Sequence, residues 1–169
     1  MILIYAFSNP WSTNISTRTL IDLQETLRSY PDIVFQKITK YPQPFFEEYI
    51  RNKLYTAIVG LGDYYGSFDK IKIESQASNL YGHHSIIPLA PSIIDLDLPF
   101  FKHIDRSQFF ISSSMSPTYG NWLAYNIQSL INQKQLTTYH LFFHLPERSN
   151  SQNNATNIAN LLITNQVLQ

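Results

Sequence analysis

The stretch FFISSSMSPTYGNWLAYNIQSLINQKQLTTYHLFF, residues 109–143, decides the fold class. It opens and closes on short runs of apolar and aromatic residues, a composition typical of buried β-strands. Between these runs, an apolar stripe repeats with helical spacing at Leu123, Ile127, Leu130 and Ile131. Ser116 with Pro117 has the residue types of a helix start. A strand, a helix and a second strand in this order indicate a sheet that is covered by helices.

The rest of the chain repeats this alternation. Further strands are expected at residues 2–6, 33–38, 55–60 and 70–74. Further helices are expected around Leu20, Leu23 and Leu27, behind a first turn that contains Pro44, and around Ile158, Leu161 and Leu162. We therefore predict one domain over residues 1–169, an α/β fold built as a three-layer α/β/α sandwich with a mostly parallel central sheet. In such a fold the ligand site lies at the carboxyl ends of strands.

Two segments break the alternation. Residues 80–102 contain Pro88, Pro91 and Pro99, which predict an extended and irregular excursion. Residues 149–157 are polar and rich in Asn and Gln, and we interpret them as a loop that leads into the last helix.

Composition excludes several classes of protein. Twelve Lys and Arg residues balance twelve Asp and Glu residues, so no net field favours binding to nucleic acid or to an anionic membrane. No apolar run approaches the roughly 20 residues needed to cross a bilayer, and the chain opens without a secretory leader, so we expect a cytoplasmic protein. The chain has no cysteine, which excludes disulfides, thiolate metal sites and thiol nucleophiles made from its own residues.

Polar residues gather at three places near the ends of expected strands. Glu74 ends one strand, where alternation puts it on the same face as Lys72, and a solvated edge is the alternative to a functional site. His144 directly follows the last expected strand, either as a capped loop residue or as a site residue. Residues 112–121 lead from a strand into a helix start, a shape that aims backbone N–H groups at a ligand.

The remaining histidines predict no metal site. His83 and His84 are adjacent on an extended segment and point in opposite directions, and neither they nor His103 match the spacing of a known metal motif. His140 lies within an apolar strand and is interpreted as a core residue. We expect neither a metal nor a cofactor.

Several of these segments resemble, in order along the chain, the pyroglutamyl peptidase I family of cysteine peptidases, which remove N-terminal pyroglutamate. Residues 110–123, FISSSMSPTYGNWL, resemble the family's strand ending in Ser-Asn-Thr-Ala-Gly, after which Cys-Asn opens a helix. Residues 72–79, KIESQASN, resemble its Val-Glu-Arg-x-Ala-x-Asn segment, and residues 142–146, FFHLP, resemble its Ile-His-Val-Pro segment. Residues 6–11, AFSNPW, are a weaker match to its N-terminal Gly-Phe-Glu-Pro-Phe loop.

The resemblance implies a catalytic unit of which only part is present. His144 matches the family's catalytic base, and Glu74 matches the carboxylate that fixes the imidazole. Gly120 stands where the family has its nucleophilic cysteine. Because glycine has no side chain with which to attack, the covalent route is lost. Members of the family often form oligomers, and the resemblance therefore implies that this chain forms a homo-oligomer.

The resemblance also implies the residues that contact a ligand. Phe7 and Trp11 match the loop that lines the family's substrate pocket, although ordinary core packing is an equal alternative for both. Leu61 stands where the family has a glutamine that recognises the lactam, and Tyr119 precedes Gly120.

Three functions therefore follow from the sequence. The first is a catalytically inactive pyroglutamyl-peptidase-like protein whose ligand is a small cyclic or N-blocked molecule, such as a peptide N-terminus. The second is an active hydrolase in which His144, with Glu74, activates a water molecule or a hydroxyl. The third is a structural scaffold that uses its aromatic surface for a partner protein.

Overall fold

The computed structural model describes residues 1–8, 14–39, 41–96, 98 and 103–168 of the chain. In chain order its elements are β1 (Ile2–Phe7), α1 (Ile15–Thr26), β2 (Ile33–Ile38), α2 (Pro42–Tyr49), β3 (Ala57–Tyr64), β4 (Ile71–Glu74), β5 (Gln76–Ser78), β6 (Ile93–Asp95), β7 (Phe109–Ser112), α3 (Tyr119–Lys134), β8 (Tyr139–Pro146) and α4 (Ser151–Thr164). No helix within these described ranges is both long enough and apolar enough to cross a membrane.

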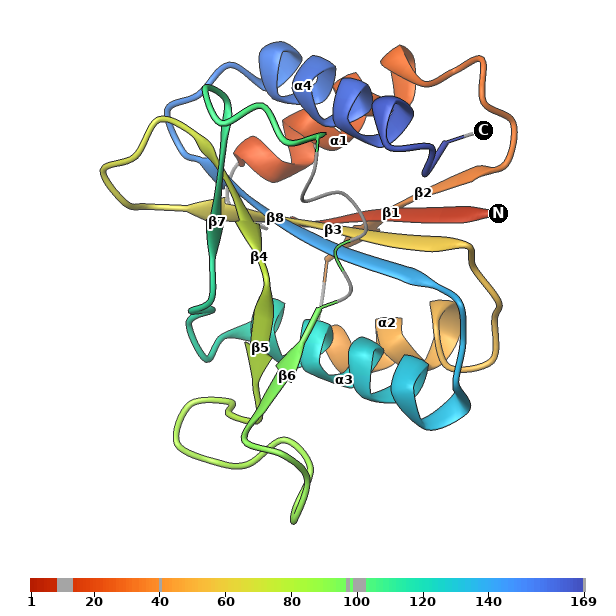
Figure 1. The fold of residues 1–169 in the computed structure, drawn as a ribbon, viewed down its shortest axis with the longest axis vertical. Helices are drawn as coiled ribbons and strands as arrows, with labels where there is room; N and C mark the ends of the chain where they lie inside the picture. Colours follow the sequence, from red (N-terminus) through yellow and green to blue (C-terminus); the bar gives the residue numbers. More distant parts are fainter. Residues whose placement is uncertain (9–13, 40, 97, 99–102, 169) are drawn as a thin grey trace.

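The central sheet has the order β2-β1-β3-β8-β4-β7 in the described part of the chain. Strands β2, β1, β3 and β8 run parallel to one another, whereas β4 pairs antiparallel with β8 and parallel with β7. Helices α1 and α4 cover one face of the sheet, and α2 and α3 cover the other (Figure 1). This arrangement confirms the predicted three-layer sandwich with a mostly parallel sheet.

The core forms between these layers because the central strands are apolar on both faces. Strands β1, β3 and β8 are almost completely buried, and the predicted stripe on α3 packs inward through Leu123, Ile127 and Ile131. Alternation along β8 turns His140 towards Gln128 of α3, so His144, four residues further on, faces the same helix layer.

Three predicted boundaries are wrong. Strand β8 continues to Pro146, so His144 lies within the strand and is not a capped loop residue. Helix α3 begins at Tyr119 with Thr118 as its N-cap, rather than at Pro117 behind Ser116. The carbonyl of Ser116 instead accepts a hydrogen bond from the N–H of Thr118 at 2.7 Å, which makes a tight turn before the helix. Residues 151–157, predicted as loop, form the first half of α4, because the Asn150 side chain caps that helix by accepting from the N–H of Asn153 at 2.9 Å.

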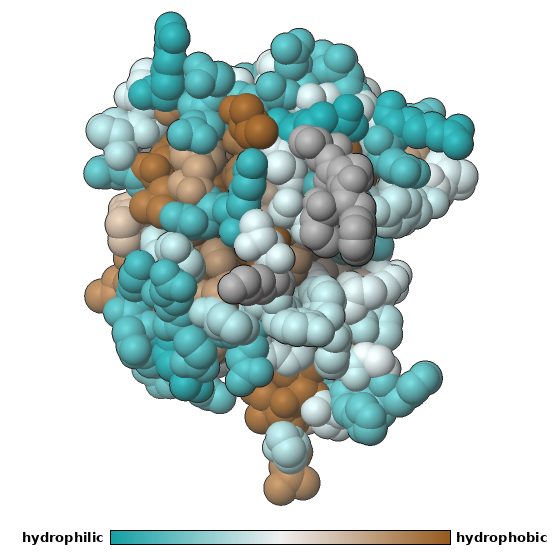
Figure 2. All heavy atoms as spheres, turned by 180° about the vertical axis from the view of Figure 1, so that it is seen from behind, coloured by the Kyte–Doolittle hydropathy of each residue, from teal (hydrophilic) through white to brown (hydrophobic). Residues whose placement is uncertain are grey.

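The predicted irregular excursion contains regular structure. Strands β5 and β6 pair antiparallel, with Gln76 opposite Asp95 and Ser78 opposite Ile93. Together with the loop that joins them, they project from the body of the fold (Figure 1). From behind, hydrophilic side chains alternate with several apolar patches, one of which lies just above that projecting loop (Figure 2).

Candidate functional site

The structure brings Glu74 and His144 into direct contact. Nδ1 of His144 lies 2.6 Å from Oε1 of Glu74. The contact depends on the antiparallel pairing of β4 with β8, which sets Lys72 opposite His144, so that the carboxyl ends of the two strands pass each other. Glu74 is fully buried, and the alternative of a solvated edge is therefore wrong. Strand β7 pairs on the outer side of β4 and makes it an interior strand.

Lys72 is a third member of this cluster that the sequence reasoning missed. Its ammonium lies 2.8 Å from the same Oε1 of Glu74 and donates to the carbonyl of Ser114 at 3.2 Å. Its side chain is only 11% exposed. Alternation had placed Lys72 on the same face as Glu74, but only the position of β4 inside the sheet shows that both are buried.

Charge in the cluster is balanced between two residues. The ammonium of Lys72 and the carboxylate of Glu74 neutralise each other, while the other carboxylate oxygen, Oε2, is buried without a partner among the described residues. Because the carboxylate accepts, Nδ1 of His144 is the donor in this contact, and Nε2 is the ring nitrogen left for another group. The cluster therefore fixes the orientation of the imidazole.

Gly62 allows the imidazole to sit against β3. It lies opposite His144 in the parallel pairing of β3 with β8. A Cβ atom at residue 62 would come within 3.0 Å of Cδ2 and 3.3 Å of Nε2 of His144. A side chain at this position would displace the ring, so the position of the base depends on this glycine.

Gly120 lies in the first turn of α3 and is buried. A Cβ atom here would meet Cζ of Phe142 at 3.0 Å and Cε of Met115 at 3.7 Å. The ring of Phe142 in turn lies 5.0 Å, centroid to centroid, from that of His144. Phe142 therefore lies against both Gly120 and the imidazole.

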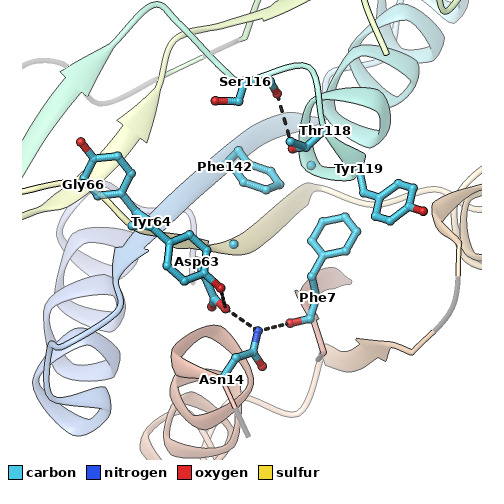
Figure 3. Close-up of a pocket in the computed structure, with 12 residues that line it drawn as sticks. Phe7, Asn14, Asp63, Tyr64, Gly66, Ser116, Thr118, Tyr119 and Phe142 are labelled. Atoms are coloured by element: carbon cyan, nitrogen blue, oxygen red, sulfur yellow. Dashed lines mark hydrogen bonds between the residues drawn. The ribbon is translucent and has the colours of Figure 1, made fainter. Parts of the chain in front are cut away.

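A cavity of about 480 Å³ opens beside Gly120. It is lined by Phe7, Asn14, Gly62, Asp63, Tyr64, Tyr65, Gly66, Ser116, Thr118, Tyr119, Gly120 and Phe142. The rings of Phe7, Tyr119 and Phe142 surround it, and Tyr64 lies across from Tyr119 (Figure 3). Among the described residues, His144 and Glu74 do not line this cavity, although Gly62 and Phe142, which both lie close to the imidazole, do.

Asp63 and Asn14 form a polar wall of the cavity that sequence reasoning also missed. Nδ2 of Asn14 donates at 2.8 Å both to the Phe7 carbonyl and to Oδ2 of Asp63. Oδ1 of Asp63 accepts from the N–H of Ser16 at 3.0 Å, so the carboxylate stabilises the N-terminus of α1. These bonds tie the ends of β1 and β3 to α1 and fix the shape of the wall.

The start of α3 supplies backbone donors to the opposite wall. Thr118, Tyr119 and Gly120 all line the cavity. The Thr118 side chain makes no capping hydrogen bond to the first turn of this described helix. N–H groups of an uncapped first turn point out of the helix and favour a carbonyl or an anion.

The predicted contact residues separate into three groups. Phe7, Tyr119 and Gly120 line the cavity. Leu61 has a fully buried side chain and is not among the described lining residues, because alternation along β3 turns it to the other face. Trp11 lies outside the described residues. Within the part of the chain that the structure describes, no three His, Asp or Glu side chains are grouped to hold a metal ion.

Comparisons with known proteins agree with this fold. No protein-family model matches the sequence, and no curated protein matches it. Pyroglutamyl peptidase I from Bacillus amyloliquefaciens is similar in structure, with a TM-score of 0.79 and 16% identity over 99% of this chain and 95% of that chain. A mutant pyrrolidone carboxyl peptidase from Pyrococcus furiosus has a TM-score of 0.81 and 18% identity over 98% of this chain and 97% of its own.

A further pyrrolidone carboxyl peptidase, from Fervidobacterium islandicum, has a TM-score of 0.75 and 18% identity, and the match covers 96% of this chain and 97% of that chain. At such identities the similarity establishes the fold. It is the fold that the sequence resemblance implied.

Proposed function

We propose that this chain is a pyroglutamyl-peptidase-like protein that binds a small cyclic or N-blocked ligand and does not cleave it through a thiol intermediate. Gly120 carries the proposal. It lines the cavity at the start of α3, it contacts the same Phe142 that packs on His144, and it offers no nucleophile. The chain has no cysteine at any other position.

The lining of the cavity favours a flat ring with a carbonyl group. Phe7, Phe142 and Tyr119 present aromatic surface, which suits the face of a planar ring. The first turn of α3 presents N–H donors, which suit a carbonyl or carboxylate oxygen. A five-membered lactam with an amide substituent has both features.

Hydrolysis by water is the second candidate, and the Glu74–His144 contact favours it. A carboxylate on Nδ1 orients the imidazole and leaves Nε2 to accept a proton from water. Thr118 brings a hydroxyl to the cavity wall, but this hydroxyl donates to the carbonyl of Ser116 at 3.4 Å. Because His144 is not among the described residues that line the cavity, we rank this function below binding.

Turnover and binding assays on the purified chain test the proposal. We expect no His144-dependent hydrolysis of a fluorogenic pyroglutamyl amide, and we expect pyroglutamamide to raise the Tm. The His144→Ala variant controls for contaminating peptidase. Hydrolysis that disappears in His144→Ala would establish the hydrolase instead, and the absence of both hydrolysis and a Tm shift would favour the scaffold.

A gain-of-function variant tests the role of residue 120. Gly120→Cys places a thiol at the start of α3, where Phe142 must yield by a few tenths of an ångström. We expect hydrolysis of the pyroglutamyl amide to appear in this variant and to be abolished in Gly120→Cys/His144→Ala. Gly120→Ser is the matched control, because its hydroxyl is a much poorer nucleophile than a thiol at neutral pH. If Gly120→Cys binds pyroglutamamide but never turns over, residue 120 is not the nucleophile position.

A further inference from the structure

A second hollow adjoins the ligand cavity. Its volume is about 590 Å³, and it is lined by Tyr81, Gly82, His83, His84, Pro117, Thr118 and Tyr119. Thr118 and Tyr119 line both spaces, so the ring of Tyr119 is a wall between them. The two spaces therefore adjoin at the start of α3.

Hydrogen bonds fix the loop side of the hollow against α3. Tyr81 and His84 close a tight turn, in which the N–H of Tyr81 donates to the carbonyl of His84 at 2.8 Å. Gly82 adopts the left-handed conformation that this turn requires, with φ +59°, and its N–H donates to the Pro117 carbonyl at 3.0 Å. The turn is thus tied to the segment that precedes the helix.

Asn121, buried in the first turns of α3, holds the same loop from the other side. Its Nδ2 donates to the carbonyls of Leu80 at 2.7 Å and Ser78 at 2.9 Å. Its Oδ1 accepts from the N–H of Ser78 at 2.8 Å. With every polar atom of its side chain engaged, Asn121 makes the hollow a preorganised feature of the fold.

The described lining of the hollow is rich in aromatic rings and contains no Asp, Glu, Lys or Arg. The rings of Tyr81 and Tyr119 stack with centroids 5.6 Å apart and planes at 22°. Tyr41 packs edge-on against Tyr119 at 5.8 Å. Tyr81 and Tyr119 are 38% and 39% exposed, so both rings still offer surface to a ligand. Such a surface can pack against a further aromatic ring.

We propose that this hollow binds an aromatic side chain carried by the second residue of an N-blocked peptide whose first residue lies in the cavity. The inference rests on the proposed function. If the N–H groups at the start of α3 hold the carbonyl of the first residue, the nitrogen bonded to that carbonyl lies beside Thr118 and Tyr119. The next side chain then extends over Tyr119 towards Tyr81.

Calorimetry with three probes tests the proposal: pyroglutamamide, pyroglutamyl-glycinamide and pyroglutamyl-phenylalaninamide. We expect the phenylalanine probe to bind roughly three- to tenfold more tightly than the glycine probe, the range that one aromatic pair provides. Tyr81→Ala should remove this ratio and leave the affinity for pyroglutamamide unchanged. Tyr81→Phe keeps the ring and should keep the ratio.

Tyr139→Ala is the matched control, because Tyr139 is equally exposed at 38% but lies at the start of β8. It should leave the ratio intact. Tyr81→Leu keeps apolar bulk without an aromatic ring, and it replaces Tyr81→Ala if thermal unfolding shows that the smaller residue disrupts the loop.

Failure of the two proposals gives different results. If the wild type binds pyroglutamamide but shows no preference for phenylalanine, or keeps the preference in Tyr81→Ala and Tyr81→Leu, the second hollow is not the subsite and the proposed function stands. If no probe binds, the proposed function fails and the subsite with it. If sedimentation shows self-association that Tyr81→Ala abolishes, and no preference among the probes, a second copy of the chain occupies the hollow.

Discussion

Strand β8 carries two histidines on one face, four residues apart, in opposite chemical settings. His140 is fully buried, and its Nδ1 lies 3.2 Å from the neutral amide oxygen of Gln128. Its Nε2 has no partner among the described residues, and burial lowers its pKa to about 3. His144 contacts the carboxylate of Glu74 at 2.6 Å, and its side chain keeps 14% exposure.

The difference between the two histidines comes from the elements that pack against each end of β8. Near the start of β8, helix α3 covers the sheet and leaves a neutral, unreactive imidazole. Towards its carboxyl end, β4 crosses antiparallel and supplies both a carboxylate and an ammonium. His140 is therefore a core side chain, whereas His144, on the same face of the same strand, is a candidate base. Three substitutions test this contrast.

Removing the charge of Glu74 should have the largest effect. Glu74→Gln leaves the ammonium of Lys72 buried without its counter-charge, which we expect to lower the free energy of unfolding by about 3 kcal/mol. Glu47→Gln is the matched control, because Glu47 pairs with Arg51 at the same 2.8 Å but on an exposed helix surface. That change should cost less than about 0.5 kcal/mol in urea unfolding. Equal losses in the two variants would show that burial does not distinguish these ion pairs.

Lowering the pH should reduce the free energy of unfolding, because His140 is buried as a neutral imidazole. Its pKa of about 3 in the folded state lies below the ordinary value of 6.5, so the unfolded chain binds the proton first as the pH falls. Stability is therefore fully present above pH 6.5 and is lost from there down to about pH 3, by roughly 1.4 kcal/mol per pH unit.

Urea unfolding at pH 7 and pH 5 measures this loss. His140→Gln should remove about 2 kcal/mol of the difference between the two pH values. The same pH difference in unfolding free energy is measured for His144→Gln, which changes the histidine nearer the carboxyl end of β8. An unchanged pH difference in His140→Gln would mean that this imidazole is already protonated or solvated in the folded protein.

Gly62→Ala should have the smallest effect on stability of the three changes, and its structural effect should be confined to the surroundings of His144. The new methyl group would press on Cδ2 and Nε2 of His144, at a cost of about 1 kcal/mol or slightly more. Side-chain ¹⁵N spectra should show the His144 signals shift from the Nδ1-protonated pattern of the wild type, while those of His140 stay in place. Unchanged His144 signals would mean that β3 does not position the ring.

Local patterns predicted much of this molecule. The 3.6-residue repeat on α3 and the short apolar runs of the strands were enough for the sandwich, because burial on one helix face or in a strand leaves a direct trace in the sequence. Glu74 and His144 could be singled out for the same reason, as polar residues at the ends of apolar strands. The pairing of β5 with β6 could not be predicted, because no local pattern marks it. The helix cap at Asn150 could not be predicted either, because it lies in a polar stretch that resembles a loop.

The sequence by itself determined that the chain's own side chains supply no thiol, because the chain contains no cysteine. Only the tertiary structure decided that Lys72 joins Glu74, that Phe142 lies against both Gly120 and His144, and that Tyr81 reaches Tyr119. Each of these contacts depends on strand order or on a loop packing against a distant helix. The free energy of such contacts is set by burial and geometry, which no single segment of the chain encodes.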